Sequence, residues 1–371
     1  MIDFEKRLTS LKNRRHGAEE IAALSKRAEF SEALESLSNE RDAFEALREL
    51  NGIKYAIGAM ASVGKKYTDT SINEGYRVAN AVTAGLHTLG ESVTSKLQGS
   101  VALDIHIKGF SDVDMLIICN NPISTQRPHL NPSVYSDSKD PRSIHEIVDS
   151  IATNSERIIS SKFYAASVKR GNKSIVVEGG SLTRKVDIVP AIWHDSHDYQ
   201  RSRQEHDRGI QIYDRSKPQL LANYPFTHIK KVEERDQIYS GSLKSLIRLI
   251  KNMIADMPDY KNQKAKKLSS YDIAAICYHM DSELRVPQYF QLGLIEKLRI
   301  YLDYIANNSQ YRFRLDVPDG TRKIFDSPEK IEALNILRSE VADLVTSIAR
   351  EINPYHSTYT PVDILNKAVV F

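Results

Sequence analysis

Two aspartates, Asp112 and Asp114, stand one residue apart at the start of an apolar run, Leu116-Ile117-Ile118. Aspartate is depleted in strands, and two like charges ~4 Å apart repel by ~4 kcal/mol at an effective dielectric of 20. Because side chains alternate along a strand, both carboxylates would share one face, with Val113 and Met115 on the other. A divalent cation would offset the repulsion, since Mg²⁺ takes oxygen ligands and completes its shell with waters and phosphates. The spacing therefore predicts a magnesium site.

A third carboxylate, Asp187, interrupts a second apolar strand pattern, Val186-Asp187-Ile188-Val189. If this strand pairs beside the first, three carboxylates converge. Three aspartates suffice for two Mg²⁺ ions ~3.5–4 Å apart, one at an attacking hydroxyl and one at a triphosphate. Alone, an Asp-x-Asp pair is more often an exposed strand edge, and a single buried aspartate is often capped or paired. Their order and spacing together favour the metal site.

A Gly-Ser dipeptide, Gly99-Ser100, precedes Asp112 by about a dozen residues and follows a helical pattern. A glycine turn lets backbone N–H groups approach a phosphate closely, and the serine hydroxyl adds a donor. The Gly-Lys-Ser/Thr ending of a Walker A loop is missing, so this is a different kind of phosphate turn.

The periodicity of the chain divides it into two halves of different character. The first half predicts helices mixed with a few strands that are distant in sequence, and the second half predicts long helices only. The expected helices are 1–50, 71–95, 143–157, 240–254, 269–280, 289–308 and 328–352, and the expected strands are 112–119, 175–180 and 185–193.

The composition is that of an ordinary globular chain: 371 residues, 41% hydrophobic, 27% charged, with a net charge of +3. The near-neutral balance argues against bulk binding to a long duplex. Cys119 and Cys277 lie in apolar runs and are expected to be buried thiols, neither a disulfide nor a zinc framework. With no apolar run of about 18 residues and no signal peptide, we expect a cytoplasmic protein without a membrane span.

Gly-Ser, then Asp-x-Asp on a strand, then a later apolar-Asp-apolar strand is the signature of the polymerase-β-type nucleotidyltransferases. The stretch QGSVALDIHIKGFSDVDM (98–115) resembles the cGAS/DncV-like nucleotidyltransferases (CD-NTases) of bacterial CBASS anti-phage systems. The helical stretches LKSLIRLIK (243–251) and LSSYDIAAICYH (268–279) are similar to the second domain of oligoadenylate synthetases and cGAS. RGIQIYDR (208–215) and NYPFTHI (223–229) match as well. Vertebrate cGAS carries a His/Cys zinc insertion, which two widely separated cysteines cannot form.

The resemblance implies an α+β fold in two domains. Residues 1–225 would form N-terminal helices and a polymerase-β-like nucleotidyltransferase core, a mixed sheet with a long spine helix. Residues 226–371 would form a helical domain of the oligoadenylate synthetase type that closes the active-site cleft. Carried over residue by residue, Asp112 and Asp114 match the metal-binding pair and Asp187 the third catalytic carboxylate, all three as ligands of two Mg²⁺ ions, or Mn²⁺ in their place. Gly99 and Ser100 match the turn that binds the donor triphosphate.

Three further nucleotide-binding residues are implied only by the resemblance. Lys251 matches a helix lysine that reaches the donor phosphates, Ser270 a second triphosphate contact, and Tyr271 a side chain that stacks near the base. The sequence itself leaves simpler interpretations open. Lys251 could belong to a solvated basic stripe with Lys244 and Arg248, the pair Ser269-Ser270 could cap the following helix, and Tyr271 could be a core residue.

The reaction that follows is attack of a ribonucleoside hydroxyl on the α-phosphate of a nucleoside triphosphate, with pyrophosphate leaving. The resemblance implies ATP and GTP among the substrates, a cyclic di- or trinucleotide second messenger as product, and an effector protein that responds to it. No long nucleic acid is required, and any activating partner stays open. The alternative is a linear template-independent nucleotidyltransferase, oligoadenylate-synthetase-like or RNA-tailing. A catalytically silent scaffold is a third class, which the intact aspartates disfavour. Base identity, linkage and ring size are not fixed by any motif.

Overall fold

The computed structural model describes residues 2–17, 42–136, 138–355 and 361–369. Contacts divide the chain into two compact units. The sheet unit comprises Gly64–Asp104 and Ser111–Lys231, and the helical unit comprises Met1–Val63, Ile105–Phe110 and Val232–Phe371. The described residues before Gly64 thus group with the C-terminal helices. The expected domain boundary at residue 225 stays a prediction.

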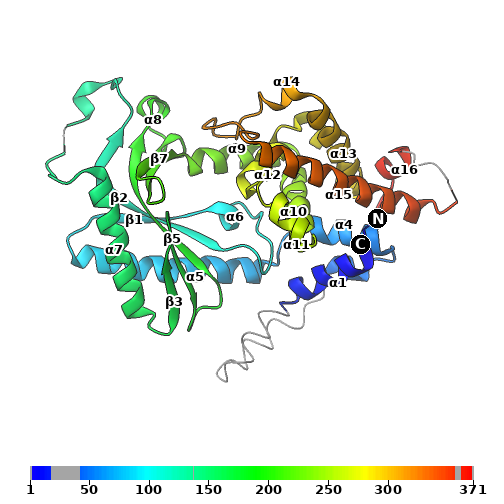
Figure 1. The fold of residues 1–371 in the computed structure, drawn as a ribbon, viewed down its shortest axis with the longest axis horizontal. Helices are drawn as coiled ribbons and strands as arrows, with labels where there is room; N and C mark the ends of the chain where they lie inside the picture. The colour runs from blue at the N-terminus through cyan, green and yellow to red at the C-terminus, as the bar shows by residue number, and fades with distance from the viewer. Residues whose placement is uncertain (1, 18–41, 137, 356–360, 370–371) are drawn as a thin grey trace. The chain divides into compact units, whose positions relative to one another are not determined.

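The sheet unit is built on one mixed sheet, which confirms the predicted α+β class (Figure 1). Its order is β1-β2-β5-β4-β3, and β6 pairs with β5 and then with β7. Strands β2 and β5 run parallel, and the other pairs are antiparallel. The strands are β1 (Val93–Gln98), β2 (Val113–Thr125), β3 (Ala166–Arg170), β4 (Ile175–Gly179), β5 (Val186–Asp195), β6 (Gly209–Asp214) and β7 (Gln219–Asn223).

Two long helices, α5 (Lys65–Thr88) and α7 (Ile144–Lys162), pack on one face of this sheet. Helix α5 corresponds to the expected helix 71–95, but it begins earlier than expected and ends before β1, whose first three residues were assigned to the helix. Helix α7 begins at a capping box, in which Ser143 and Glu146 each satisfy the other's backbone N–H. The shared core includes Val78, Val82, Leu86, Met115, Ile117, Ile147, Ile151, Ile159, Val186 and Ile188.

The opposite face of the sheet carries a smaller apolar cluster, in which Leu116 and Ile118 of β2 meet Val189, Ala191 and Trp193 of β5. Because side chains alternate along each strand, the residue two before Leu116 and the residue two before Val189 lie on this same face. Both are aspartates. Short elements complete the unit: α6 (Gly99–Ala102), η2 (Pro132–Val134), α8 (His197–Ser202) and η3 (Glu205–Asp207).

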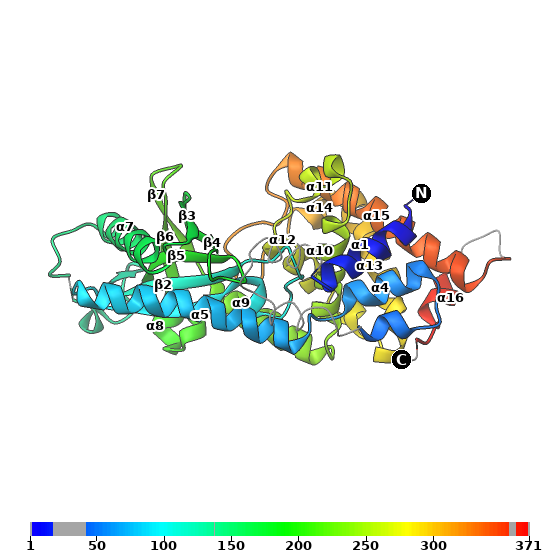
Figure 2. The same cartoon turned by 90° about the horizontal axis from the view of Figure 1, so that it is seen from below.

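The helical unit confirms the four helices expected after residue 240 (Figure 2). Helix α10 contacts α4, α12 and α13, and α13 packs along α15. The apolar face of α10 is fully buried and includes Leu243, Leu246, Ile247 and Ile250. The helices are α1 (Phe4–Arg15), η1 (Ala43–Ala46), α4 (Asn51–Met60), α10 (Ser242–Ala255), α11 (Asp259–Ala265), α12 (Ser270–Tyr278), η4 (Asp281–Leu284), η5 (Gln288–Phe290), α13 (Gln291–Asn307), α14 (Ser309–Arg312), α15 (Pro328–Ile352) and α16 (Pro361–Leu365), while α9 (Pro225–Ile238) begins in the sheet unit and ends in the helical one.

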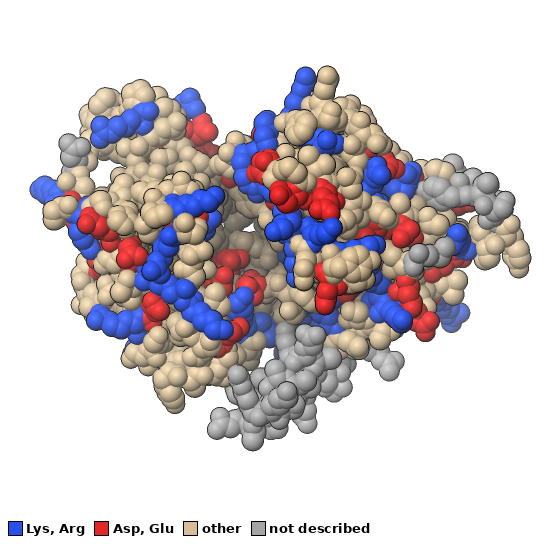
Figure 3. Space-filling view, in the orientation of Figure 1, with Lys and Arg blue, Asp and Glu red and all other residues tan. Residues whose placement is uncertain are grey.

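The N-terminal helix expected over residues 1–50 is only partly testable, because 18–41 lie outside the described residues. Around that gap, α1 and η1 are helical. Within the described part of the chain, no helix combines the length and apolar character needed to cross a membrane. Cys119 and Cys277 are free and buried, as expected. On the face shown in Figure 3, Lys and Arg are interspersed with Asp and Glu over both units.

Candidate active site

The central feature of the site is the pairing of β2 with β5. Asp114 and Asp187 are Cα partners in this parallel ladder. Partners in a parallel register project to the same face, so the two carboxylates lie side by side. Asp112 comes two residues before Asp114, and the N–H of Val113 donates to the carbonyl oxygen of Lys185 at 3.0 Å. The structure therefore brings the three predicted aspartates together at the starts of the neighbouring central strands β2 and β5, a region called the carboxylate edge below.

Sequence reasoning missed the residue that pairs with Asp112. The ammonium of Lys185 lies 2.6 Å from Asp112 Oδ2, and both side chains are a little over one-third exposed. The hydrogen bond to Asp112, with the nearby charges of Asp112 and Asp187, raises the pKa of Lys185. A signal was available: Lys185 precedes Asp187 by two residues, as Asp112 precedes Asp114, so paired strands place it on the same face.

Asp187 is partly buried, and its two carboxylate oxygens have different surroundings. Its Oδ1 is buried and has no hydrogen-bond partner, while Oδ2 accepts from the hydroxyl of Ser174 at 3.4 Å. Burial, then the negative charge of Asp112, raises the pKa of Asp187. A buried carboxylate oxygen without a donor, next to further carboxylates, has the chemistry of a hard-cation ligand. The donor set thus fits Mg²⁺.

The carboxylates are adjacent without forming a closed ligand cluster. Over the described ranges, no group of three or more His, Cys, Asp or Glu side chains is gathered closely enough to hold a metal ion. Asp112 is instead engaged by Lys185. The role of the three aspartates as metal ligands stays a prediction.

Gly99 lies directly against Asp114. Its φ is +75°, a conformation that glycine adopts without strain. A Cβ at this position would collide with Asp114 Oδ2, so only glycine lets the turn and the carboxylate approach so closely. The turn follows strand β1, whose last residue, Gln98, is the register partner of Asp114. The prediction that it follows a helix is therefore wrong, although Gly99 does lie beside Asp114. The role of Gly99 and Ser100 in binding a triphosphate stays a prediction.

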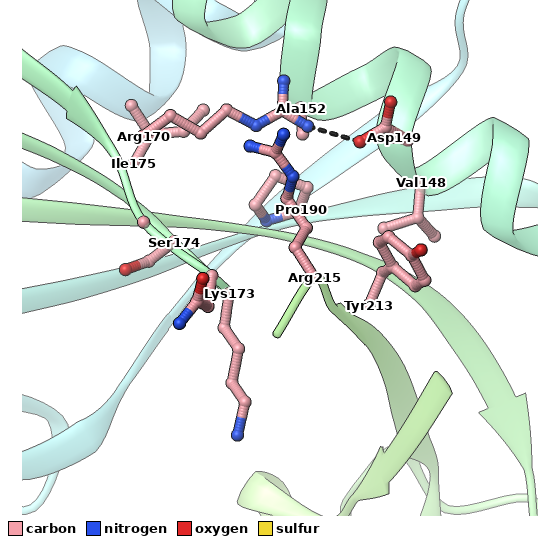
Figure 4. Close-up of a pocket in the computed structure, with 12 residues that line it drawn as sticks. Val148, Asp149, Ala152, Arg170, Lys173, Ser174, Ile175, Pro190, Tyr213 and Arg215 are labelled. Carbon is pink, nitrogen blue, oxygen red and sulfur yellow. Dashed lines mark hydrogen bonds and ion pairs between the residues drawn. The ribbon is translucent and has the colours of Figure 1, made fainter. Parts of the chain in front are cut away.

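A small hollow behind Ser174 is separate from this site (Figure 4). It lies between α7, the β3–β4 turn and the end of β6, and an Arg170–Asp149 ion pair of 2.6 Å crosses its wall. Its volume is about 20 Å³, room for about one water molecule. This volume is too small for a nucleotide. Ser174 lines the hollow and donates its hydroxyl to Asp187.

Lys251, Ser270 and Tyr271 belong to the helical unit, and the aspartates to the sheet unit. The ammonium of Lys251 is buried and donates to the carbonyl oxygen of Ile105 at 2.9 Å. Arg248 is also buried and donates to the carbonyl of Met60 at 2.8 Å. The interpretation of a solvated basic stripe is therefore wrong for these two cations. A shared site with the aspartates stays a prediction.

Ser270 and Tyr271 stand in the first turn of α12. Ser269, not Ser270, is the N-cap and forms a capping box with Asp272. Ser270 is consequently exposed and available to a ligand. The hydroxyl of Tyr271 donates to Asp319 Oδ2 at 2.6 Å, and burial, with the charge of Asp319, raises the pKa of Tyr271 well above its usual range. This bond fixes the direction of the Tyr271 ring.

The mixed sheet, its long helix and the paired aspartates define a polymerase-β-like nucleotidyltransferase fold. Comparison with known proteins narrows the class. Residues 230–345 match the family described as the cGAS/DncV-like nucleotidyltransferase C-terminal helical domain. A cyclic dinucleotide synthase CdnE from Yersinia aleksiciae is 35% identical over 326 residues, which cover 86% of this chain and 84% of that protein.

Two further relatives agree. A c-di-GMP synthase from Capnocytophaga granulosa is 30% identical over 319 residues, covering 80% of this chain and 87% of that protein. The solved structure of a STING-associated CdnE c-di-GMP synthase from the same species superimposes with a TM-score of 0.68 at 26% identity, covering 93% of this chain and 98% of that chain. The chain belongs to the cGAS/DncV-like nucleotidyltransferases, which confirms the resemblance, and it is a nucleotidyltransferase enzyme.

Proposed function

We propose that this enzyme joins two ribonucleoside triphosphates into a cyclic dinucleotide, with release of two pyrophosphates. The observation that carries the proposal is the register pair Asp114–Asp187, with Asp112 beside it, in a chain of this family. Relatives support the cyclic product, since those that align over most of this chain are named cyclic dinucleotide or c-di-GMP synthases.

Each transfer is one in-line displacement. A ribose hydroxyl oxygen bonds to the α-phosphorus of the donor, the bond from that phosphorus to the bridging oxygen breaks, and pyrophosphate leaves with the electron pair. The hydroxyl proton goes to solvent or to a carboxylate. The second transfer closes the ring when the acceptor end of the linear intermediate becomes the donor. No covalent enzyme intermediate is needed, so catalysis depends on positioning and electrostatics.

The three aspartates are the residues that would hold the metal ions for the transfer. Two Mg²⁺ ions, or Mn²⁺, held by Asp112, Asp114 and Asp187 would favour deprotonation of the attacking hydroxyl and neutralise charge on the triphosphate. Asp187 is fixed on a central strand, with one buried oxygen unpartnered. Rigid strands keep the carboxylates in one geometry through both transfers, whereas the Gly99-Ser100 turn offers backbone and hydroxyl donors to the phosphates.

In the helical unit, we assign Lys251 and Ser270 to phosphate contacts and Tyr271 to the base. Lys251 would have to exchange the Ile105 carbonyl for a phosphate oxygen, which is a stronger acceptor. Ser270 is exposed at the start of α12, and Tyr271 presents a ring fixed through Asp319. These assignments rest on the family motif.

GTP is the first substrate to test, because three of the relatives are named c-di-GMP synthases. The product would act as a second messenger in anti-phage defence and would be recognised by an effector protein. The name STING-associated, printed for the Capnocytophaga synthase, supports an effector of this kind.

The test is to incubate the enzyme with Mg²⁺ and every combination of the four nucleoside triphosphates, treat with phosphatase, and identify products by mass. We expect a phosphatase-resistant product with the mass of a cyclic dinucleotide, which is absent in the Asp112→Asn/Asp114→Asn variant. A ladder of phosphatase-sensitive oligomers would overturn cyclisation in favour of a linear nucleotidyltransferase. A product that persists in the double variant would overturn the assigned site.

A further inference from the structure

Lys185 is a cation held at the carboxylate edge, and no sequence motif accounts for it. Its ammonium is 2.6 Å from Asp112 Oδ2, and its carbonyl oxygen accepts the N–H of Val113. The backbone bond fixes the start of β5 against the start of β2. The backbone of Lys185 is therefore held in place beside β2, and its side chain starts from a fixed position.

The ammonium of Lys185 lies among negative charges, closest to the carboxylate of Asp112. Asp112, Asp114 and Asp187 lie on one face, and like charges held close together raise the free energy of the ionised state. Lys185 offsets part of this repulsion. A bound divalent cation would do the same, with more charge and at the same carboxylate oxygens. The ammonium and the metal ion therefore compete for Asp112.

We propose that Lys185 is a positioning residue that stands in for the metal ion in the nucleotide-free enzyme and releases Asp112 when the metal arrives. The inference rests on the metal site of the proposed function. Its consequence is that the free enzyme binds metal weakly. A triphosphate supplies both negative charge and further oxygen ligands, so metal loading is coupled to the arrival of the nucleotide.

The sheet unit offers a matched control for the loss of a positive charge. Lys169 on β3 pairs with Glu178 at 3.6 Å, and its side chain is 71% exposed. Lys169→Met removes one charge from the same unit without removing a partner of Asp112. Lys185→Arg keeps the charge and can hold the carboxylate in a bidentate pair.

The experiment measures Mn²⁺ affinity of the nucleotide-free protein by electron paramagnetic resonance, which needs no turnover. We expect Lys185→Met to bind Mn²⁺ about threefold to tenfold more tightly than the wild type, because the competing charge is gone. Lys169→Met and Lys185→Arg should stay within about twofold of the wild type. Thermal unfolding without metal verifies that each variant is folded. Equal or weaker binding by Lys185→Met would overturn the inference, as would an equal gain in Lys169→Met.

The Asp112→Asn/Asp114→Asn variant separates this inference from the proposed function. If the wild type binds Mn²⁺, the double variant does not, and Lys185→Met gains no affinity, only the role of Lys185 is refuted. If no variant binds Mn²⁺ with or without nucleotide, the metal site itself is refuted and the inference falls with it.

Discussion

Asp114 and Asp187 are direct register partners on the parallel strands β2 and β5, and their carboxylates lie side by side on one face of the sheet. A slip of one residue in either strand would move one of the two carboxylates to the opposite face, into the core under α5 and α7. Leu116 and Val189 each come two residues after an aspartate and pack in one apolar cluster. A slip would take one of them out of that cluster, so their packing opposes it. The packing of the sheet thus determines the geometry of the site.

Asp187→Asn should raise the thermal stability of the metal-free protein. Burial and the charge of Asp112 raise the pKa of Asp187, so its ionised form destabilises the fold at any pH above the folded pKa. The destabilisation declines as pH falls below the raised folded-state pKa and vanishes only below the unfolded-state pKa. We expect a midpoint about 1–2 °C above the wild type near pH 8, with the difference lost at acidic pH. A gain that is equal at both pH values would refute the ionic cause.

Gly99→Ala should abolish most activity while leaving the protein folded. The added methyl would displace Asp114, and a shift of about 1 Å can cost about a hundredfold in rate. Gly90→Ala is the matched control, because Gly90 has a similar φ of +82° but open space around a Cβ. Both variants place an L-residue at positive φ, at a backbone cost of about 1–2 kcal/mol. Turnover should fall only in Gly99→Ala. Equal activities would show that Asp114 tolerates the displacement.

Lys251→Met should weaken both folding and nucleotide binding. The Ile105 carbonyl loses its buried donor, at a cost of about 1–3 kcal/mol in the free energy of unfolding. If Lys251 also reaches the donor phosphates, the KM for nucleotide should rise about tenfold or more. Lys244→Met on the same helix, where Lys244 pairs with Glu233, should leave KM unchanged. A loss of stability with unchanged KM would make Lys251 purely structural.

Tyr271→Phe should separate the hydroxyl of this side chain from its ring. Loss of the bond to Asp319 is expected to lower the free energy of unfolding by about 1–2 kcal/mol. Because the ring remains, nucleotide KM should change less than about threefold, whereas Tyr271→Ala should raise it about tenfold if the ring stacks on a base. The two KM values decide the assignment. Similar values for Phe and Ala would exclude stacking.

The carboxylates were predictable from sequence because the signal is local. An aspartate inside an apolar run is rare, and alternation assigns its face without knowledge of the partner strand. Strand β1 was not predictable in this way. Its residues Thr94, Ser95 and Lys96 are polar, and the strand is stabilised by pairing with β2, which local periodicity does not reveal. The pattern therefore extended the preceding helix too far.

The contacts of Lys251 and Lys185 were less predictable than the carboxylates. A lysine on a helix is ordinarily solvated, whereas Lys251 is buried and donates to Ile105, which precedes it by 146 residues, so its burial has no local signal. Lys185 has the same explanation, since its partner Asp112 precedes it by 73 residues. The two contacts emerge only from the structure, although the two-residue spacing between Lys185 and Asp187 indicates that both side chains lie on one face of the sheet.

The central claim is that nucleotidyl transfer takes place at the edge formed by Asp112, Asp114 and Asp187. The most direct measurement is pyrophosphate release from GTP and ATP with Mg²⁺, comparing the wild type with Asp187→Asn at matched concentrations of folded protein. We expect the wild type to release pyrophosphate, and we expect the rate for Asp187→Asn to be at least about a thousandfold lower. A folded Asp187→Asn protein that keeps more than about a tenth of the wild-type rate would contradict the central claim.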